Sequence, residues 1–309
     1  MDYKNLINAF MFDNILFMDI NIIKKKKVSY SQFSNWYICP MRWKLDYIDK
    51  LKQFEDNLIM TFGTSIHETI QLYLSLLYKK GDERANELDA VKYFKWRFKK
   101  NITLKKIPHT AEEFEEFVQD GKNIINEFKS PSNRLRYFPR DKWELLGIED
   151  ELNVDILNNV SLTAFIDIVL KEKSTGNIKI IDFKTSNSGW TTYQKEDFTK
   201  CAQLVIYKAL YSKKHNIPLS KIDVEFFILR RKLYENCKYE QSRIQIFKPS
   251  AYQRDVNEVI TEFSNFVNTC FTPTGIHKTD IKYSKNPNDG KNCKFCPYKK
   301  NKKCDGIAD

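Results

Sequence analysis

The sequence has 309 residues, 42% of them hydrophobic and 14% aromatic, which is enough to bury a core of its own. A formal net charge of +11 points to an anionic partner, first of all nucleic acid, although AT-rich coding also enriches a protein in lysine. Polar residues interrupt the apolar stretch 6–23, so this stretch cannot span a bilayer. We therefore expect no membrane partner.

The seven cysteines are an odd number, and the first residues do not resemble a signal peptide. Both features indicate an intracellular, reducing setting such as the cytoplasm. In that setting, clustered cysteines bind metal ions more often than they form disulfides.

Residues 1–28 are assigned to an N-terminal extension whose role the sequence does not reveal. Residues 29–48 then predict two helical stretches, in which aromatic side chains recur at the spacing of core residues. Cys39 and Pro40 lie between the two stretches. Cys39 alone would be a small buried hydrophobic residue, so its role depends on where the other cysteines lie.

An amphipathic helix is predicted over residues 61–77, because apolar side chains recur along one of its faces. His67 and Glu68 lie in its first turns, after Gly63. On this helix taken alone, His67 is best explained as a capping or solvent-facing side chain.

The region of about 80–140 is largely helical in pattern and heavily charged, which predicts a helical insertion. A strand is predicted next, over residues 143–156. Glu149 and Glu151 on this strand are candidate groups for a neighbouring metal site. Equally, they fit as ordinary carboxylates of an edge strand.

A β-hairpin is predicted over residues 162–184, and each of its strands carries one aspartate among apolar residues, Asp167 and Asp182. Buried carboxylates need a positive partner, because desolvation is costly. Asp182 and Lys184 point to the same face of their strand, and strand pairing lets Asp167 reach that face. This arrangement suits a divalent cation with a nucleophilic water; a buried Asp–Lys ion pair is the simpler alternative.

A long helix is predicted over residues 195–215, where Gln203 and Tyr207 are four residues apart and share a face. Such a pair is ordinarily a surface or core contact. The elements predicted after this helix are two strands and a further helix, at 222–231, 243–247 and 250–270.

The tail, residues 275–304, is rich in lysine and contains Cys293-x-x-Cys296 followed by Cys304. The Cys-x-x-Cys spacing lets two thiolates reach one metal ion. Cys39 is the candidate fourth ligand, because Cys39 and Cys296 both precede a proline and the other cysteines lie singly. Four thiolates suit zinc and an iron–sulfur cluster equally.

With these residues in view, the sequence resembles the RecB/AddB-type branch of the PD-(D/E)xK nuclease superfamily, over residues 29–304. Five features carry the resemblance, in the family's order: Gly63-x-x-x-His67, Asp167, Asp182-Phe183-Lys184, Gln203-x-x-x-Tyr207, and the cysteines 39, 293, 296 and 304. One departure is Ala164, which stands where the family usually has glycine. No motif of the family lies in residues 80–140.

The resemblance implies an α/β restriction-endonuclease-like fold, with a central mixed sheet flanked by helices, a helical insertion and a C-terminal metal cluster. Residues 29–304 would form one nuclease domain. His67, Asp167, Asp182 and the Phe183 carbonyl would hold Mg²⁺ or Mn²⁺, and Lys184 would orient the water or stabilise the transition state. Gln203 and Tyr207 would position the DNA strand or Lys184. The resemblance alone favours a 4Fe–4S cluster over zinc at the four cysteines.

The implied function is a metal-dependent deoxyribonuclease, specifically an exonuclease acting on DNA ends or single strands in recombination, repair or phage replication. Two alternatives stay open: an inactive, nuclease-shaped DNA-binding subunit, and a structural zinc module of a larger assembly. No nucleotide-binding motor motif is present in the sequence, so a helicase or recombination partner would supply any unwinding. A phage-encoded protein that acts in its host cell is consistent with this implied function.

Overall fold

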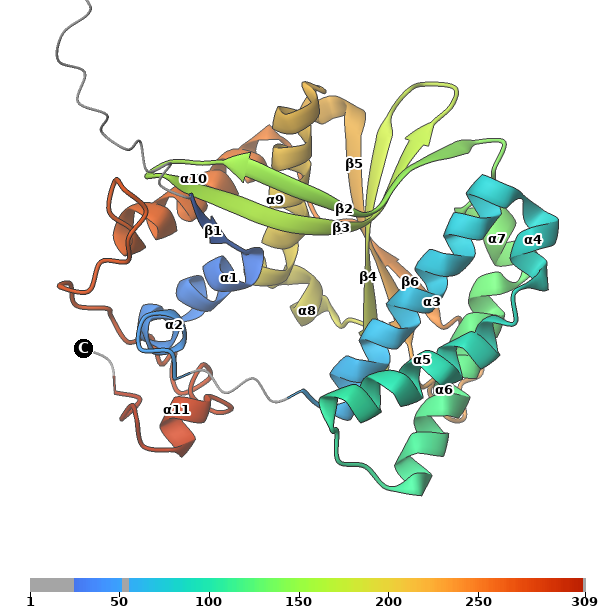
Figure 1. Cartoon of the computed structure of the whole chain (residues 1–309), viewed down its shortest axis with the longest axis horizontal. Helices are drawn as coiled ribbons and strands as arrows, with labels where there is room; N and C mark the ends of the chain where they lie inside the picture. The colour runs from blue at the N-terminus through green and yellow to red at the C-terminus, as the bar shows by residue number, and fades with distance from the viewer. Residues whose placement is uncertain (1–24, 52–55, 308–309) are drawn as a thin grey trace, which may run out of the picture.

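The computed structural model describes residues 25–51 and 56–307, and Figure 1 draws the rest of the chain in grey. In the described part, six strands form one mixed sheet, and helices pack on both of its faces. The predicted α/β architecture with a mixed, helix-flanked sheet is therefore confirmed. Most of the predicted N-terminal extension, residues 1–24, lies outside the described residues.

The strands of the sheet are β1 (Lys26–Val28), β2 (Trp143–Asp155), β3 (Val160–Glu172), β4 (Ile178–Ser186), β5 (Ile222–Arg230) and β6 (Ile244–Phe247). The helices are α1 (Tyr30–Ile38), α2 (Pro40–Tyr47), α3 (Leu58–Lys80), α4 (Asp82–Glu87), α5 (Ala90–Lys105), α6 (Ala111–Lys129), α7 (Pro131–Tyr137), α8 (Thr192–Glu196), α9 (Phe198–His215), α10 (Gln253–Cys270) and α11 (Pro297–Lys300), with a 3₁₀ turn at Leu219–Lys221. None of the helices in this part of the chain is long and apolar enough to cross a membrane.

The long strand β3 organises the sheet. It pairs antiparallel with β2 along one edge, and its other edge is shared between β1, which is parallel, and β4, which is antiparallel. β1 pairs with residues 160–162 and β4 with residues 168–171, so in the described chain residues 163–167 lack a strand partner on that edge. β3 and β4 thus separate at Asp167, as the two strands of Figure 1 do near the centre of the molecule.

Each face of the sheet has its own hydrophobic core. On one face, α1, α2, α9 and α10 pack against side chains such as Ile180, Phe226 and Ile228. On the other face, α3, α5 and α6 pack against side chains such as Phe183 and Phe227. Because side chains alternate along a strand, the even-numbered residues of β4 and β5 face α9 and the odd-numbered ones face α3. The end of β4 therefore lies between two helical layers.

Two differences from the sequence prediction go beyond a shift of a few residues at an end. The single helix predicted over residues 195–215 is wrong: α8 ends at Glu196, and Asp197 caps a new helix by accepting a hydrogen bond from Thr199 N (2.9 Å). Residues 26–28, assigned to the N-terminal extension, instead form β1 and pair with β3. A three-residue strand gives no periodic signal of its own, and it exists here because β3 offers it a free edge.

Candidate active site

Asp167 and Asp182 face each other where β3 and β4 separate. The ladder pairs run from Lys171–Ile178 to Ile168–Ile181, and Asp167 and Asp182 are the first residues beyond the end of this ladder. Asp167 Oδ2 accepts a hydrogen bond from Phe183 N (2.7 Å), which fixes this carboxylate against the β4 backbone. Asp182 is only 4% exposed. The hairpin predicted from the sequence therefore brings its two aspartates together.

Lys184 supplies the positive charge beside them. Its Nζ lies 2.7 Å from Asp182 Oδ2, as expected for two residues on one face of a strand. Burial nevertheless raises the pKa of Asp182 to about 6, with Asp167 raising it and Lys184 lowering it. Burial likewise raises the pKa of Asp167 to about 6. One ammonium group does not fully compensate two buried carboxylates, so this site favours an additional cation.

His67 reaches the site from α3. The helix can pass close to the end of β4 because Gly63 has no side chain: a Cβ there would lie 2.9 Å from Thr185 Oγ1. His67 Nδ1 is 3.7 Å from Asp167 Oδ2, and the ring packs edge-on against Phe183 with centroids 6.0 Å apart. Burial lowers the pKa of His67 to about 4, so the imidazole is neutral near pH 7. A neutral imidazole is the form that binds a metal ion.

Gln203 and Tyr207 reach the same carboxylates from α9. Gln203 Nε2 donates hydrogen bonds to Asp182 Oδ1 (3.1 Å) and to Tyr207 OH (2.9 Å). Tyr207 is buried, which raises the pKa of its hydroxyl above the usual range and keeps it protonated. Gln203 and Tyr207 therefore do more than form a surface or core contact, because Gln203 orients the Asp182 carboxylate.

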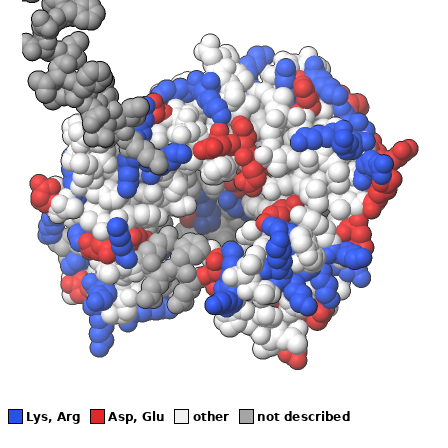
Figure 2. Space-filling view, viewed as in Figure 1, with Lys and Arg blue, Asp and Glu red and all other residues white. Residues whose placement is uncertain are grey.

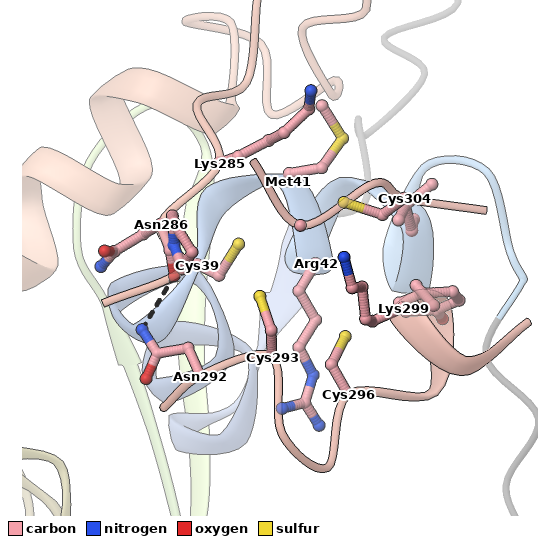
Figure 3. A pocket seen from close by; sticks show the side chains of 14 residues that line it. Cys39, Met41, Arg42, Lys285, Asn286, Asn292, Cys293, Cys296, Lys299 and Cys304 are labelled. Atoms are coloured by element: carbon pink, nitrogen blue, oxygen red, sulfur yellow. Dashed lines mark hydrogen bonds between the residues drawn. The ribbon is translucent and has the colours of Figure 1, made fainter. Parts of the chain in front are cut away.

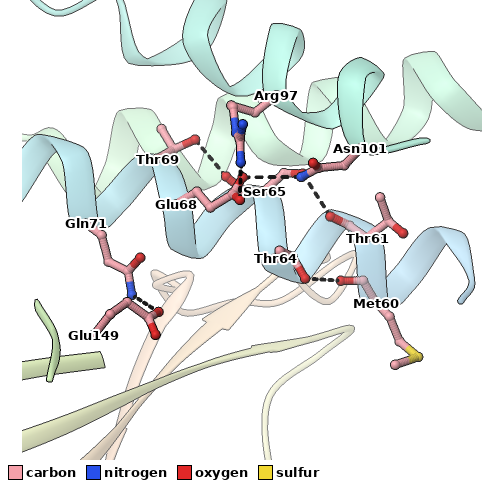
Figure 4. Close-up of polar contacts among 10 residues, drawn as sticks. All are labelled: Met60, Thr61, Thr64, Ser65, Glu68, Thr69, Gln71, Arg97, Asn101 and Glu149. Carbon is pink, nitrogen blue, oxygen red and sulfur yellow. Dashed lines mark hydrogen bonds and ion pairs between the residues drawn. The ribbon is translucent and has the colours of Figure 1, made fainter. Parts of the chain in front are cut away.

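The two glutamates of β2 have different surroundings. Glu149 adopts φ of +51°, uncommon for a residue with a side chain, at an irregular point of the β2–β3 ladder. Gln71, one turn after His67 on α3, donates to Glu149 Oε1 (2.6 Å), as Figure 4 shows. Glu151 instead lies at the surface, 3.9 Å from Lys27 Nζ. Glu149 therefore borders the site, whereas Glu151 is an ordinary edge carboxylate.

A polar network holds α3 against α5, and sequence reasoning missed it. Arg97 donates from Nε and Nη2 to the two carboxylate oxygens of Glu68, with Nε–Oε2 at 2.7 Å (Figure 4). Asn101 Nδ2 donates to Glu68 Oε2 (3.2 Å) and to Ser65 Oγ (3.1 Å). Because Glu68 follows His67 directly, this network fixes the turn of α3 that carries the histidine.

Figure 2 shows a hollow at the centre of one face, with Lys and Arg side chains at its bottom. The hollow lies between the part of the molecule that contains α1, α2 and α11 and the part that contains α3 and α5 (Figure 1). Acidic as well as basic side chains surround the hollow, but the basic ones at its bottom are suited to a nucleic-acid backbone, because positive charge concentrates an anionic ligand.

The residues at the end of β4 fit a hard divalent cation. Asp182 Oδ2 is buried, and among the described residues its partner is the Lys184 ammonium group, 2.7 Å away. Oxygen ligands and a neutral imidazole suit Mg²⁺ or Mn²⁺. As they stand, no three or more His, Cys, Asp or Glu side chains within residues 25–51 and 56–307 are grouped to hold a metal ion. Asp167 and Asp182 would have to turn from their present partners to bind one.

The four cysteines selected from the sequence line one pocket, shown in Figure 3. Cys39 comes from the junction of α1 and α2, and Cys293, Cys296 and Cys304 come from the tail around α11. Burial raises the pKa of Cys293, and the three neighbouring cysteines raise it further. Asn286 and Asn292 of the tail both donate to Ile38 O, at 3.0 and 3.1 Å. The tail therefore docks beside Cys39.

Comparisons with known proteins place the chain in a family. The family model described as PD-(D/E)XK nuclease superfamily matches residues 27–301. No curated protein matches the sequence. Among solved structures, a candidate exonuclease from Eubacterium rectale is similar, with a TM-score of 0.50 and 10% identity over 86% of each chain. SSO0001 matches with a TM-score of 0.31 and 13% identity, over 82% of this chain and 88% of that one.

At 10% identity the Eubacterium rectale structure supports the fold alone, and the SSO0001 match is too distant to carry weight. The family match covers most of the sequence and includes Asp167, Asp182, Lys184, Gln203 and Tyr207, which the fold gathers at one point. The chain therefore belongs to the PD-(D/E)XK nuclease superfamily.

Proposed function

We propose that this protein is a metal-dependent deoxyribonuclease of the RecB/AddB type, an exonuclease that acts on DNA ends or single strands. The observation that carries this proposal is the meeting of Asp167, Asp182, Lys184 and His67 at the point where β3 and β4 separate. The family match and the basic hollow support nucleic acid as the substrate. Recombination, repair or phage replication in a reducing cytoplasm is the setting that we propose.

Asp167, Asp182, His67 and the Phe183 carbonyl would hold one or two Mg²⁺ or Mn²⁺ ions. When bound, such an ion lowers the pKa of a coordinated water and neutralises charge on the scissile phosphate. Lys184, whose side chain is 32% exposed, can reach from Asp182 toward a phosphate oxygen and stabilise the negative charge that develops there. Gln203 keeps Asp182 oriented, and the Glu68–Arg97 pair keeps His67 in place.

Cys39, Cys293, Cys296 and Cys304 would bind a 4Fe–4S cluster, with zinc as the alternative. Their shared pocket and the docking of the tail on Ile38 support a common site, but four thiolates do not by themselves select the metal. This site would tie the two ends of the described chain together, at a distance from the carboxylates. It supports the cytoplasm as the location, because free thiolates persist in a reducing compartment.

A first prediction concerns metal dependence. We expect the purified protein to degrade end-labelled DNA with Mg²⁺ or Mn²⁺, to stop when EDTA removes the metal, and to bind DNA without turnover in Ca²⁺, because the site offers hard oxygen ligands. The measurement is a time course on DNA labelled at the 5′ or the 3′ end. Stepwise loss from one end identifies an exonuclease, whereas internal fragments identify an endonuclease.

Two outcomes would contradict the proposed function. Cleavage at the same rate in EDTA would mean that the chemistry does not use a divalent cation. DNA binding without cleavage in any of these metals would identify an inactive, nuclease-shaped binding subunit. Adding back Mg²⁺ after EDTA is the control that separates metal loss from damage to the protein.

A further inference from the structure

Arg230 is the last residue of β5 and Arg231 follows it, and the two arginines have opposite surroundings. Arg231 is buried, and its Nη2 lies 2.8 Å from Asp120 Oδ2 and 3.5 Å from Glu116 Oε1. Arg230 is half-buried, yet no carboxylate in the described part of the chain forms an ion pair with it. Its Nε is buried and has no hydrogen-bond partner there. The fold thus neutralises one arginine and leaves its neighbour without an anion.

Arg230 lies on the same face of the sheet as the active-site residues. In the parallel β4–β5 ladder, Lys184 pairs with Ile228 and Ser186 pairs with Arg230. Paired residues of neighbouring strands point to one side, so Arg230 shares the face of Asp182 and Lys184. It lies two residues beyond Lys184 along the strands, or about 7 Å. This step is comparable with the spacing of successive phosphates in an extended DNA strand.

The lower part of the Arg230 side chain is enclosed. Gly189 has φ of +97°, and a Cβ at this position would lie 2.9 Å from Arg230 Nε, so the turn after β4 can cover the arginine only with glycine here. The Ser186 hydroxyl closes that turn through Gly189 N (3.2 Å) and Gly189 O (3.0 Å). Arg230 N also donates to Arg243 O (2.8 Å). These contacts hold the inner part of the Arg230 side chain in place, and its two terminal nitrogens, Nη1 and Nη2, can bind a ligand.

A half-buried cation without an anion is costly, unless a ligand supplies the missing charge. Guanidinium groups bind phosphodiesters well, because the planar donors meet two oxygens at once. We propose that Arg230 binds the phosphodiester adjacent to the scissile one and so sets the register of the DNA strand over Asp182 and Lys184. This inference rests on the proposed nuclease function and adds a phosphate subsite to it.

The test combines a protein variant with a modified substrate. Single-stranded oligonucleotides carry one uncharged methylphosphonate, placed on either side of the bond that is cut first, and initial rates in Mg²⁺ give KM and kcat. For the wild type, a neutral linkage on one of the two sides is expected to raise KM about ten-fold. Arg230→Gln should raise KM about ten-fold on unmodified DNA, with kcat nearly unchanged, and be insensitive to that methylphosphonate.

Two further variants separate this role from bulk charge and from folding. Arg254→Gln removes an exposed positive charge, whose side chain is 91% accessible, and should leave KM near the wild-type value. Arg230→Lys keeps the charge but loses the two-pronged contact, so its KM should lie between those of the wild type and Arg230→Gln. The melting temperature of Arg230→Gln should not fall, because no ion pair of the described chain is lost.

The proposal is overturned if Arg230→Gln leaves KM unchanged, or if the methylphosphonate weakens the wild type and Arg230→Gln equally. A melting temperature several degrees lower, with the methylphosphonate effect retained, would make Arg230 a structural residue. These results require an active wild type. If the wild type neither cleaves nor binds DNA, the proposed nuclease function fails, and the phosphate subsite fails with it. If the wild type is active and Arg230→Gln behaves like it, only the phosphate subsite fails.

Discussion

Asp182→Asn is expected to reduce metal-dependent DNA cleavage by about a thousand-fold or more, comparable with the loss of a central electrostatic group in other enzymes. The side chain is buried between Asp167, Lys184 and Gln203, and it supplies the charge that would hold the cation. DNA affinity should change little, because phosphate contacts elsewhere in the basic hollow provide most of it. Single-turnover cleavage and DNA binding in Ca²⁺ measure the two effects separately.

Thermal unfolding of the metal-free protein provides the control for this variant. Burial raises the pKa of Asp182 to about 6, above the 3.8 of an ordinary aspartate, so the folded state disfavours the ionised form. This penalty is absent at low pH and is fully present above pH 6. Asp182→Asn should therefore raise the melting temperature at pH 8, and the gain should shrink toward pH 5. A variant that loses both activity and stability at pH 8 would instead indicate a structural ion pair with Lys184.

The sequence predicts which residues meet at the end of β4 because the signals for these residues are local patterns. Two apolar strands joined by a polar turn specify the hairpin, and the two-residue repeat of a strand then places Asp182 and Lys184 on one face. The four-residue spacing of Gln203 and Tyr207 does the same on α9. Each of these predictions needs only the geometry of one element, and the contacts found between the residues confirm their proximity.

The features that escaped prediction depend on contacts between distant segments. Nothing in residues 143–156 reveals that Gln71 forms a hydrogen bond with Glu149. Nothing in the sequence near Arg230 reveals that Asp120 forms an ion pair with Arg231 and not with Arg230. The break before α9 is different, because Asp197 followed by Thr199 is a recognisable helix start that the longer apolar pattern concealed. The Gln71–Glu149 and Asp120–Arg231 pairs lie 78 and 111 residues apart in the sequence, so only the packed fold decides them, whereas a helix cap depends on residues that are close in the sequence.

Cys39→Ser is expected to lower the free energy of unfolding by several kcal/mol, if the four cysteines share a metal centre. Cys39 and Cys293 are more than 250 residues apart, and closing so long a loop is worth about 4–5 kcal/mol when the relation for disulfides is applied. Part of the docking survives without a metal, because Tyr298 is buried and donates to Asp46 while Asn292 holds Ile38 O. The variant should thus be folded but less stable.

The matched control is Cys237→Ser, because Cys237 is exposed and does not line the pocket of Figure 3. Anaerobically purified wild type and Cys237→Ser should be brown, absorb near about 400 nm and contain iron, whereas Cys39→Ser should lose colour and iron together. A colourless wild type with one zinc per chain would show that the four cysteines bind zinc instead of iron, and the structural role of the site would stand. If the wild type contains neither metal and Cys39→Ser melts at the same temperature, hydrogen bonds and the burial of Tyr298 alone hold the tail against α1 and α2.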